Sequence, residues 1–514
     1  MKKYILFVTL SACFIFNYNA FAQSGVFSKT YSNPSYWLEG KSFVQTTNNT
    51  YMVAGAYGYL LKLDSAGTLL WGKKIGDPYL TFKHIIETKD TNYLIVGDNY
   101  NLTDSMPTIV CIKVNSSGDT IWSKEFTQSS NSYSLSVIET YDNGFVISGY
   151  LDFATPPYTK MLLIKIDSMG ITQWSNVISN GNWENYSYDV QQTPDSGYVI
   201  NSLTVNDTGL DFAVNAALTK LNSSGNVVWS NTYSHATTPT NTMTTSMEVT
   251  PAGIVTTLAI LPGNDLVIMK TDFLGNVIWS NSYNNLSANG LDLNTTKPPI
   301  HRTSDGGYVA LTANLLRNTI LKIDSLGNVQ WNRDFEAFAI DVIQTSDLGY
   351  AILASGIPGS LLNSLIVVMK TDSLGNGSTC IANDSTYSQI YSLNATPIST
   401  TQYADGSSAN YYPLVSSFTI YTDTACFQNF DGINENLLGN ISVYPNPSTS
   451  FFTFSGLQGK CSIEIYDVTG KIILTEITSE EKMNINLDSQ SKGIYFYRVI
   501  EKNNNIRQGK ISLQ

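Results

Sequence analysis

Histidine, cysteine and charged side chains are all scarce in this sequence of 514 residues. It holds three His and five Cys, and Asp, Glu, Lys and Arg together make up 14% of the chain, against roughly 25% in typical soluble domains. So low a charge density excludes a disordered chain that is solvated by its charges. The formal net charge is −12 and no block of Lys or Arg is present, so we expect no nucleic-acid partner.

Apolar runs long enough to cross a membrane are also missing. The longest apolar stretch near the N-terminus, Tyr4–Phe16, falls short of the ~20 residues that a bilayer requires. Lys2 and Lys3 precede it, and Ala20-Phe21-Ala22 follows it. This pattern predicts a signal peptide over residues 1–22, the alternative being a buried N-terminal helix. We expect no transmembrane segment in the mature chain.

Catalytic and metal-binding motifs are absent. The sequence contains no His-x-Glu-x-x-His, no Cys-x-x-Cys-His, no Gly-rich phosphate loop and no Gly-x-Ser-x-Gly elbow. We therefore expect no cofactor and no metal, name no catalytic residue, and favour binding over catalysis. Carboxylate pairs of the glycosidase kind stay open, because they come from distant strands and leave no local motif.

Removal of a signal peptide would leave four cysteines. Cys111 lies in an apolar, strand-like run, and Cys461 lies in the C-terminal region. Cys380 and Cys426 flank one segment and would be exported to an oxidising compartment. We favour a disulfide between these two, with free thiols as the alternative.

The sequence does contain an internal repeat of about 50 residues. Each of seven copies reads Lys-x-Asp/Asn-x-x-Gly, and in six of them Trp follows nine positions after the Lys. The copies start at Lys62, Lys113, Lys165, Lys220, Lys270, Lys322 and Lys370, and their tryptophans are Trp71, Trp122, Trp174, Trp229, Trp279 and Trp331. Thr379 stands in the Trp position of the seventh copy.

A second motif precedes each copy and consists of Thr, a short polar turn and an aromatic-led apolar run, as in residues 140–147. Asp, Asn and Gly at these turns favour hairpins, and helical periodicity is absent. Four short strands in about 50 residues, seven times over, predict an all-β, seven-bladed β-propeller over residues 23–379. A β-solenoid is the alternative, although its rungs are normally shorter.

The two ends of the repeat region complement each other. The seventh copy ends without a Trp-bearing strand, whereas residues 27–31 (Phe-Ser-Lys-Thr-Tyr) resemble residues 122–126 (Trp-Ser-Lys-Glu-Phe). We therefore predict that the N-terminal strand completes the last blade, pairs near Val368 and places Phe27 where the other blades have Trp. Such closure removes an exposed sheet edge.

The Asp, Gly and Trp spacing resembles the tryptophan-docking repeat of the quinoprotein dehydrogenases, in which the Trp packs between neighbouring blades. The match is one residue shorter, so the resemblance implies the fold and not the cofactor. We expect the tryptophans to join blades rather than to form ligand platforms. The Asp or Asn of each turn is expected to cap its own hairpin rather than to bind calcium.

Two further regions follow the repeats. Residues 380–436 are rich in Ser, Thr, Asn and Tyr and are predicted to be a strand-bearing extension and linker. Residues 437–514 alternate in the manner of a small β-sandwich. Three motifs occur there in order: Tyr444-Pro445-Asn446-Pro447, a turn motif ending at Gly470, and Gly493-Ile-Tyr495-Phe.

This ordered set resembles the type A C-terminal sorting domain of the type IX secretion system. The resemblance implies export by the Sec route, passage across the outer membrane by the type IX machinery, and secretion or attachment at the cell surface. Many members end on a basic residue, whereas this chain ends on Gln514, so the processing outcome stays open.

One column of residues is a candidate ligand site. The position four residues before the Thr of each second motif is mostly small and polar, and it holds Ser42, His84, Ser136, Asp189, Ser246, Pro299 and Asp341. We predict that the column lines a central channel near one mouth. The alternative is that it joins neighbouring inner strands and binds nothing.

The loops at 98–107, 152–158 and 204–211 share no pattern, and such variation on a constant scaffold typically carries binding. The sequence thus favours a surface or secreted binding or adhesion module for a glycan or protein. The alternative is a secreted polysaccharide hydrolase or lyase that uses carboxylates at the channel mouth.

Overall fold

The computed structural model describes residues 25–514 except 34–36, 77, 101–105, 156–157, 181–183, 208–211, 236–240, 261–264, 288–298, 314–317, 336, 357–364, 378–380, 384–387, 391–392, 398, 412, 414, 419, 425–441, 458, 468–470 and 502–505. The described residues are all-β apart from one 3-10 turn, Ala56–Gly58. The chain divides into two compact units, Met1–Cys426 and Phe427–Gln514. The predicted signal peptide lies outside the described residues.

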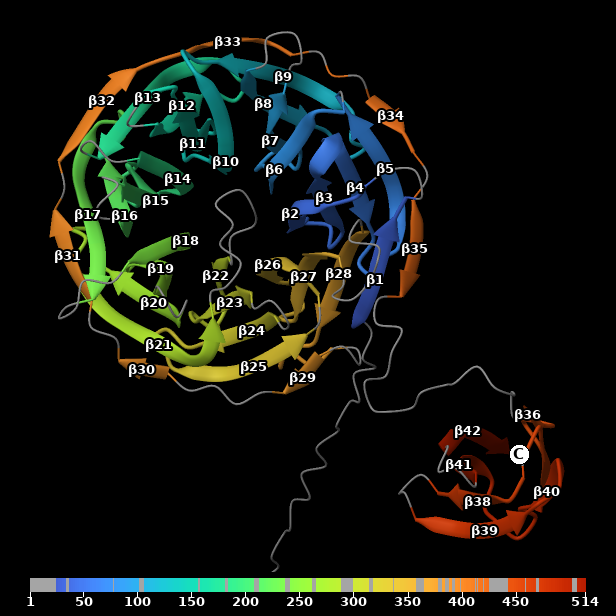
Figure 1. Cartoon of the computed structure of the whole chain (residues 1–514). Coiled ribbons are helices and arrows are strands. Elements are labelled where there is room, and N and C mark those ends of the chain that lie inside the picture. The colour runs from blue at the N-terminus through green and yellow to red at the C-terminus, as the bar shows by residue number, and fades with distance from the viewer. Residues whose placement is uncertain are drawn as a thin grey trace, which may run out of the picture. The chain divides into compact units, whose positions relative to one another are not determined.

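The first unit contains seven five-stranded antiparallel sheets. Each sheet contacts the next one along the chain, and the seventh contacts the first. Figure 1 shows them around a common centre, with one strand of each sheet innermost. The four repeat-derived strands of the sheets, innermost first, are β2 (Gly40–Gln45), β3 (Tyr51–Gly55), β4 (Tyr59–Leu63) and β5 (Leu69–Ile75); β6 (Leu80–Glu87), β7 (Tyr93–Tyr100), β8 (Pro107–Val114) and β9 (Thr120–Thr127); β10 (Asn131–Glu139), β11 (Phe145–Asp152), β12 (Thr159–Ile166) and β13 (Thr172–Asn180); β14 (Glu184–Gln192), β15 (Tyr198–Asp207), β16 (Phe212–Leu221) and β17 (Val227–His235); β18 (Thr242–Thr250), β19 (Gly253–Ile260), β20 (Asp265–Thr271) and β21 (Val277–Ser287); β22 (Ile300–Arg302), β23 (Tyr308–Ala313), β24 (Asn318–Ile323) and β25 (Val329–Phe335); and β26 (Ala339–Gln344), β27 (Tyr350–Ser355), β28 (Leu365–Thr371) and β1 (Phe27–Ser32).

The N-terminal strand β1 is the fourth strand of the last sheet. It pairs antiparallel with β28, and Lys29 lies opposite Val368 while Phe27 lies opposite Lys370. This is the pairing that the sequence predicts for residues 27–31. The last sheet therefore combines the N-terminal strand β1 with β26, β27 and β28, the last strands of the repeat region.

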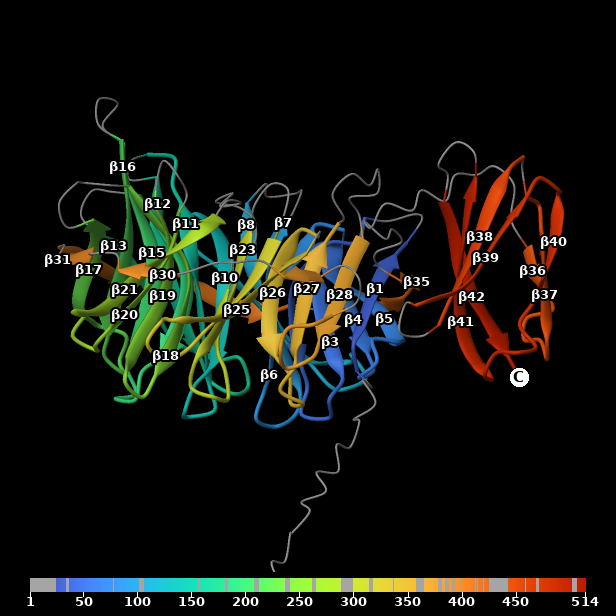
Figure 2. The ribbon, with the colours of Figure 1, turned by 90° about the horizontal axis from the view of Figure 1, so that it is seen from below.

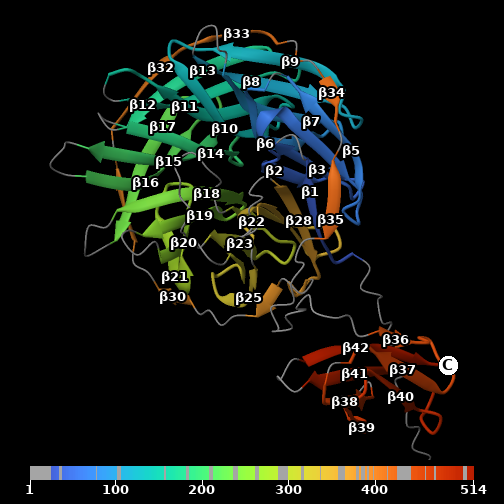
Figure 3. The same cartoon turned by 45° about the vertical axis from the view of Figure 1, so that its right-hand side comes forward.

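Each sheet has a fifth, outermost strand that the sequence did not predict. These strands all come from the extension after the repeats, and together they form what we call the outer belt, drawn in orange in Figures 1 and 3. The belt runs back around the sheets, since its strands pair in turn with β25, β21, β17, β13, β9, β5 and β1. They are β29 (Ile381–Asn383), β30 (Ser388–Ile390), β31 (Leu393–Pro397), β32 (Thr400–Ala404), β33 (Ser407–Asn410), β34 (Val415–Ser417) and β35 (Tyr421–Thr424). The predicted extension therefore bears strands, but residues 381–424 belong to the first unit rather than to a linker.

Neighbouring sheets meet through an aromatic ring placed on a glycine, a contact that we call the joint. Gly170 has φ +80°, and a Cβ on it would lie 2.9 Å from the Trp122 ring. Neither the backbone conformation nor the space admits a side chain there. The same arrangement joins Trp71 to Gly118, Trp174 to Gly225, Trp229 to Gly275, Trp279 to Gly327, Trp331 to Gly375 and Phe27 to Gly67.

Phe27 thus occupies the Trp position in the joint between the last sheet and the first. A Cβ on Gly67 would lie 2.4 Å from its ring. The hydroxyl of Tyr31 also donates to the Gly67 carbonyl, as that of Tyr233 does to Gly275 at 3.0 Å. The seventh joint therefore repeats the contact between ring and glycine of the other six, and it shares the tyrosine hydroxyl bond with the joints at Gly275 and Gly327.

Five of the seven repeat lysines are buried and connect the two sequence motifs of their sheets. In five sheets the Nζ atom reaches the Asp of the preceding Thr-x-Asp turn. Burial raises the pKa of Asp305, but hydrogen bonds from Lys322 and Thr303 lower it to about 2. The five pairs are Lys113–Asp90 (2.7 Å), Lys165–Asp142 (3.0 Å), Lys220–Asp195 (2.9 Å), Lys322–Asp305 (2.8 Å) and Lys370–Asp347 (3.0 Å).

The Asp or Asn of the outer hairpin turns caps its own turn, as expected. In the third sheet, Asp167 Oδ1 accepts from the N–H groups of Met169 and Ile171 at 2.9 and 2.8 Å. Asn115 and Asp272 accept equivalent pairs of bonds in their sheets. These contacts account for the acid or amide at this repeat position without a metal ion.

The second unit consists of two antiparallel sheets over a shared core. The core includes Phe452, Phe454, Ile463, Ile465 and Val499. One sheet contains β36 (Ser442–Tyr444), β37 (Phe451–Ser455) and β40 (Lys482–Asn486), and the other contains β39 (Ile472–Thr478), β38 (Cys461–Tyr466), β41 (Gly493–Glu501) and β42 (Ile506–Leu513).

Two of the predicted sorting motifs are tied into this unit. Asn446 accepts a hydrogen bond from the Ser512 N–H at 2.9 Å, and Tyr495 donates to the Ser491 carbonyl. Gly493 opens β41. Gly470 lies outside the described residues.

Cys111 and Cys461 are buried free thiols, whereas Cys380 and Cys426 lie outside the described residues. The disulfide between the latter two stays a prediction. Ile381 opens the outer belt and Thr424 ends it, so a bond between the adjoining cysteines would tie the two ends of the belt together.

Peptide mapping without reductant should recover a linked 380–426 peptide, and recovery of both residues only as alkylated thiols would contradict the pairing.

Loss of a joint aromatic should destabilise the first unit. We expect Trp174→Ala and Phe27→Ala each to lower the free energy of unfolding by about 3 kcal/mol, the low end of the range for buried aromatics, because both rings are only partly buried. Chemical denaturation measures the change. Trp37→Ala is the matched control, since Trp37 is 65% exposed. An F27A protein as stable as the control would show that the seventh joint does not hold.

Candidate functional site

The predicted column lies on the innermost strands, and its side chains reach from one sheet to the next. Every described member except Pro299 makes such a contact. The contacts are Ser42 Oγ with the Ile85 N–H (3.2 Å), His84 Nδ1 with the Val137 N–H (3.0 Å), Ser136 Oγ with Asp189 Oδ1 (2.8 Å), Asp189 Oδ2 with the Met247 N–H (3.4 Å), Ser246 Oγ with the Ile300 N–H (3.4 Å), and Asp341 Oδ1 with His301 Nε2 (3.1 Å). These are the bonds expected from the alternative in which the column joins inner strands, and ligand binding by it stays a prediction.

A β-bulge sets the direction of these side chains. The register between the first two strands shifts immediately before Ser42, His84, Ser136, Asp189 and Asp341. An extra residue on one strand bends it and re-aims the next side chain. The bulge therefore turns the column toward the neighbouring sheet, which sequence spacing alone does not indicate.

A charged cluster accompanies the column on β14, β18, β22 and β26. Burial raises the pKa of Glu248 to about 7, with His301 opposing the shift and Asp189 adding to it. Burial lowers the pKa of His301, but the hydrogen bond and charge of Asp341, with the charges of Glu248 and Asp189, raise it to about 9. Coupled acid and base groups of this kind are candidates for chemistry.

Sequence reasoning missed Glu248, although a signal was present. Two residues before the motif Thr, four repeats have an apolar residue, whereas three successive repeats have Gln191, Glu248 and His301. Polar residues at this otherwise apolar repeat position therefore mark three successive innermost strands, β14, β18 and β22. That departure from the repeat could have identified the cluster.

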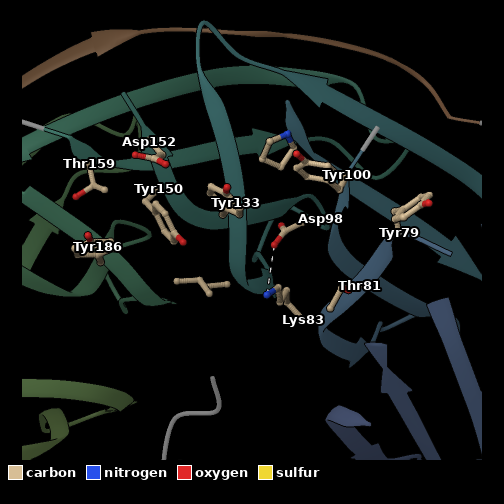
Figure 4. A pocket seen from close by; sticks show the side chains of 12 residues that line it. Tyr79, Thr81, Lys83, Asp98, Tyr100, Tyr133, Tyr150, Asp152, Thr159 and Tyr186 are labelled. Carbon is tan, nitrogen blue, oxygen red and sulfur yellow. Dashed lines mark ion pairs between the residues drawn. The ribbon is translucent and has the colours of Figure 1, made fainter. Parts of the chain in front are cut away.

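A cavity of about 420 Å³ opens across three neighbouring sheets, and five of its twelve lining residues are tyrosines (Figure 4). It lies where β6, β10 and β12 begin and where β7 and β11 end. We call it the tyrosine pocket. Its lining residues are Tyr79, Thr81, Lys83, Asp98, Tyr100, Pro107, Tyr133, Leu135, Tyr150, Asp152, Thr159 and Tyr186.

Aromatic contacts order the wall of the tyrosine pocket. The rings of Tyr133 and Tyr150 stack with centroids 5.0 Å apart and planes 23° apart. Tyr186 meets Tyr150 edge-on at 5.1 Å. Tyr79 and Tyr100 remain 46% and 45% exposed, so they offer ring surface to the solvent.

Polar groups are also held in place there. Asp98 is buried, and its carboxylate accepts from the Ser134 N–H at 2.7 Å and from Ser134 Oγ at 2.8 Å. Lys83 Nζ lies 3.5 Å from its other oxygen, as the dashed line in Figure 4 shows. Burial raises the pKa of Asp98, with Lys83 and Ser134 opposing the shift. The pocket thus combines a fixed ion pair with aromatic faces.

Two of the three variable loops contribute to this pocket. Asp98, Tyr100 and Pro107 belong to the loop at 98–107, and Asp152 begins the loop at 152–158. Two of the loops that the sequence singled out therefore border the pocket. Its tyrosines were not identified from the sequence, and only Tyr133 and Tyr186 share a repeat position, seven residues before the motif Thr. The loop at 204–211 supplies no lining residue among those that are described.

Within the described part of the chain, no group of three or more His, Cys, Asp or Glu residues could hold a metal ion. The described residues also include no helix of the length and apolarity needed to cross a membrane.

The second unit matches a known family of domains. Residues 442–513 match the family model of the secretion system C-terminal sorting domain. This unit is a type IX sorting domain. It implies the type IX machinery as a partner, and secretion or display at the outer surface as the destination. No curated protein matches the chain.

Similarity to solved structures is distant. PorZ, an essential surface component of the type IX secretion system of Porphyromonas gingivalis, shares 10% identity, with a TM-score of 0.33, over 91% of this chain and 58% of PorZ. The extracellular domain of the putative one-component system BT4673 of B. thetaiotaomicron shares 9%, over 93% of this chain and 87% of its own, with a TM-score of 0.21. The biofilm matrix protein Bap1 of V. cholerae shares 12%, over 65% and 76%, with a TM-score of 0.23. This chain spans less than two thirds of the length of PorZ.

The charged cluster predicts a pH-dependent stability. The pKa of His301 is raised from 6.5 to about 9, so its stabilising contribution is complete below pH 6.5 and is lost as the pH rises through 9. We expect the stability difference between the natural protein and His301→Gln to shrink over that window. Denaturation at pH 6, 7.5 and 9.5 measures it, and a pH-independent difference would refute the assignment.

Proposed function

We propose that the first unit is a seven-bladed β-propeller with a signal peptide before it, and that the sorting domain delivers it to the cell surface or the medium, where it binds a glycan or protein. Seven sheets in mutual contact around one centre support this fold. The proposed boundaries are residues 1–22 for the signal peptide, 23–379 for the blades, 380–436 for the outer belt and the segment after it, and 437–514 for the sorting domain.

The observation that carries the binding role is the contrast between the two faces of the first unit, seen edge-on in Figure 2. The hairpin turns that follow the Thr and Lys motifs lie at one face and repeat from sheet to sheet. The described ends of the loops of varied sequence and the tyrosine pocket lie at the other. A constant scaffold with variation confined to one face is typical of a recognition surface.

A polysaccharide hydrolase or lyase is the second candidate, and the charged cluster favours it. A carboxyl group with a pKa near 7 can serve as a general acid or base at neutral pH, and Glu248 meets that condition. Against it, Asp189 and Asp341 already accept backbone N–H groups, at 2.9 Å from Val190 and 2.8 Å from Val342. Carboxylates so engaged are suited to holding strands in place.

One experiment separates the two candidates. The full-length exported protein is applied to an array of glycans and to solubilised cell-surface proteins, and the bound polysaccharides are assayed for new reducing or unsaturated ends. We expect saturable binding without cleavage. Cleavage that Glu248→Gln abolishes, and that the exposed control Glu480→Gln retains, would establish the enzyme. Absence of binding to every glycan and protein would contradict the proposed function.

A further inference from the structure

We infer that the tyrosine pocket is a binding site for a neutral oligosaccharide. The inference rests on the proposed binding role and narrows it to one pocket and one class of ligand. It draws on three observations: exposed aromatic faces, a mixed set of fixed donors and acceptors, and charges of both signs.

The aromatic faces suit the apolar faces of sugar rings. Tyrosine offers a large, rigid contact surface together with a polar hydroxyl. Tyr79 and Tyr100 expose nearly half of their surface beside the cavity, and Tyr133 and Tyr150 are held in a stack behind them. A ligand that enters therefore meets ring surface both at the rim and in the wall.

The polar groups match hydroxyls better than charges. A hydroxyl both donates and accepts hydrogen bonds, and the pocket presents a donor at Lys83, acceptors at Asp98 and Asp152, and the hydroxyl of Thr81, which can do both. The bonds from Ser134 to Asp98 fix one of these acceptors. Such placed polar groups among aromatic walls are what orients a small ligand.

The charges disfavour an anionic ligand. The ammonium of Lys83 and the carboxylate of Asp98 compensate each other, and the remaining carboxylate of Asp152 would repel a uronate. Because Lys83 and Asp98 already pair at 3.5 Å, a neutral ligand can bind beside them without leaving a buried charge unpaired. The volume of about 420 Å³ lies in the range of small-ligand sites rather than of protein interfaces.

The test uses the full-length protein and isothermal titration with cello-, malto-, manno-, galacto- and xylo-oligosaccharides, and with oligogalacturonate, chitosan oligomers and an oligolysine peptide. Tyr100→Ala removes a rim ring, and Asp152→Asn removes a charged acceptor at the margin of the pocket. Tyr141→Ala is the matched control, because Tyr141 is 60% exposed and lies in the β10–β11 turn on the opposite face.

We expect at least one neutral oligosaccharide to bind, with affinity about tenfold weaker in the Tyr100→Ala protein, weaker in Asp152→Asn, and unchanged in Tyr141→Ala. Unfolding curves of all three variants should match the natural protein. Neutral-sugar binding that survives Tyr100→Ala and Asp152→Asn would overturn this site while leaving the proposed function intact. Preference for oligogalacturonate, chitosan or oligolysine would overturn the ligand class, and a protein that binds no probe here but binds on the array would do the same.

Discussion

The joint between neighbouring sheets is the contact on which the rest of the structure depends. It needs an aromatic ring on one sheet and, on the next, a glycine whose φ is positive and whose Cβ position is already filled by that ring. Because the sheets follow one another around a centre, loss of one joint would leave the facing sides of two neighbouring sheets without this contact. The chain avoids this by bringing Phe27, from its N-terminal strand, to Gly67.

The buried lysines and the outer belt also stabilise the sheets that the joints connect. A buried ammonium without a partner is costly, and five sheets supply a turn carboxylate for it. In the two sheets that lack this Asp, burial lowers the pKa of Lys62, with Glu87 opposing, and of Lys270, with Arg302 adding to the shift. The belt then pairs with the fourth strand of every sheet, so an edge that would face solvent is covered all the way around.

Sequence reasoning succeeded where a feature repeats and failed where it does not. The four strands of each repeat, the positions of the tryptophans and the pairing of β1 with β28 could be predicted because seven copies reinforce one pattern. The extension was expected to bear strands, but the place of β29–β35 in the seven sheets could not be predicted, since they are short, polar and paired with partners far away in the chain. The tyrosine pocket escaped detection for a related reason: its tyrosines meet only in the folded sheets, and only Tyr133 and Tyr186 share a repeat position, seven residues before the motif Thr.

Strand β1 is an interior strand, held between β28 on one side and β35 on the other, although it comes from near the N-terminus. Hydrogen–deuterium exchange followed by mass spectrometry tests this most directly. The amides of residues 27–32 should exchange as slowly as those of β9, which has the same place in its own sheet. Exchange of that segment within the first seconds, while β9 stays protected, would contradict a ring closed by the N-terminal strand.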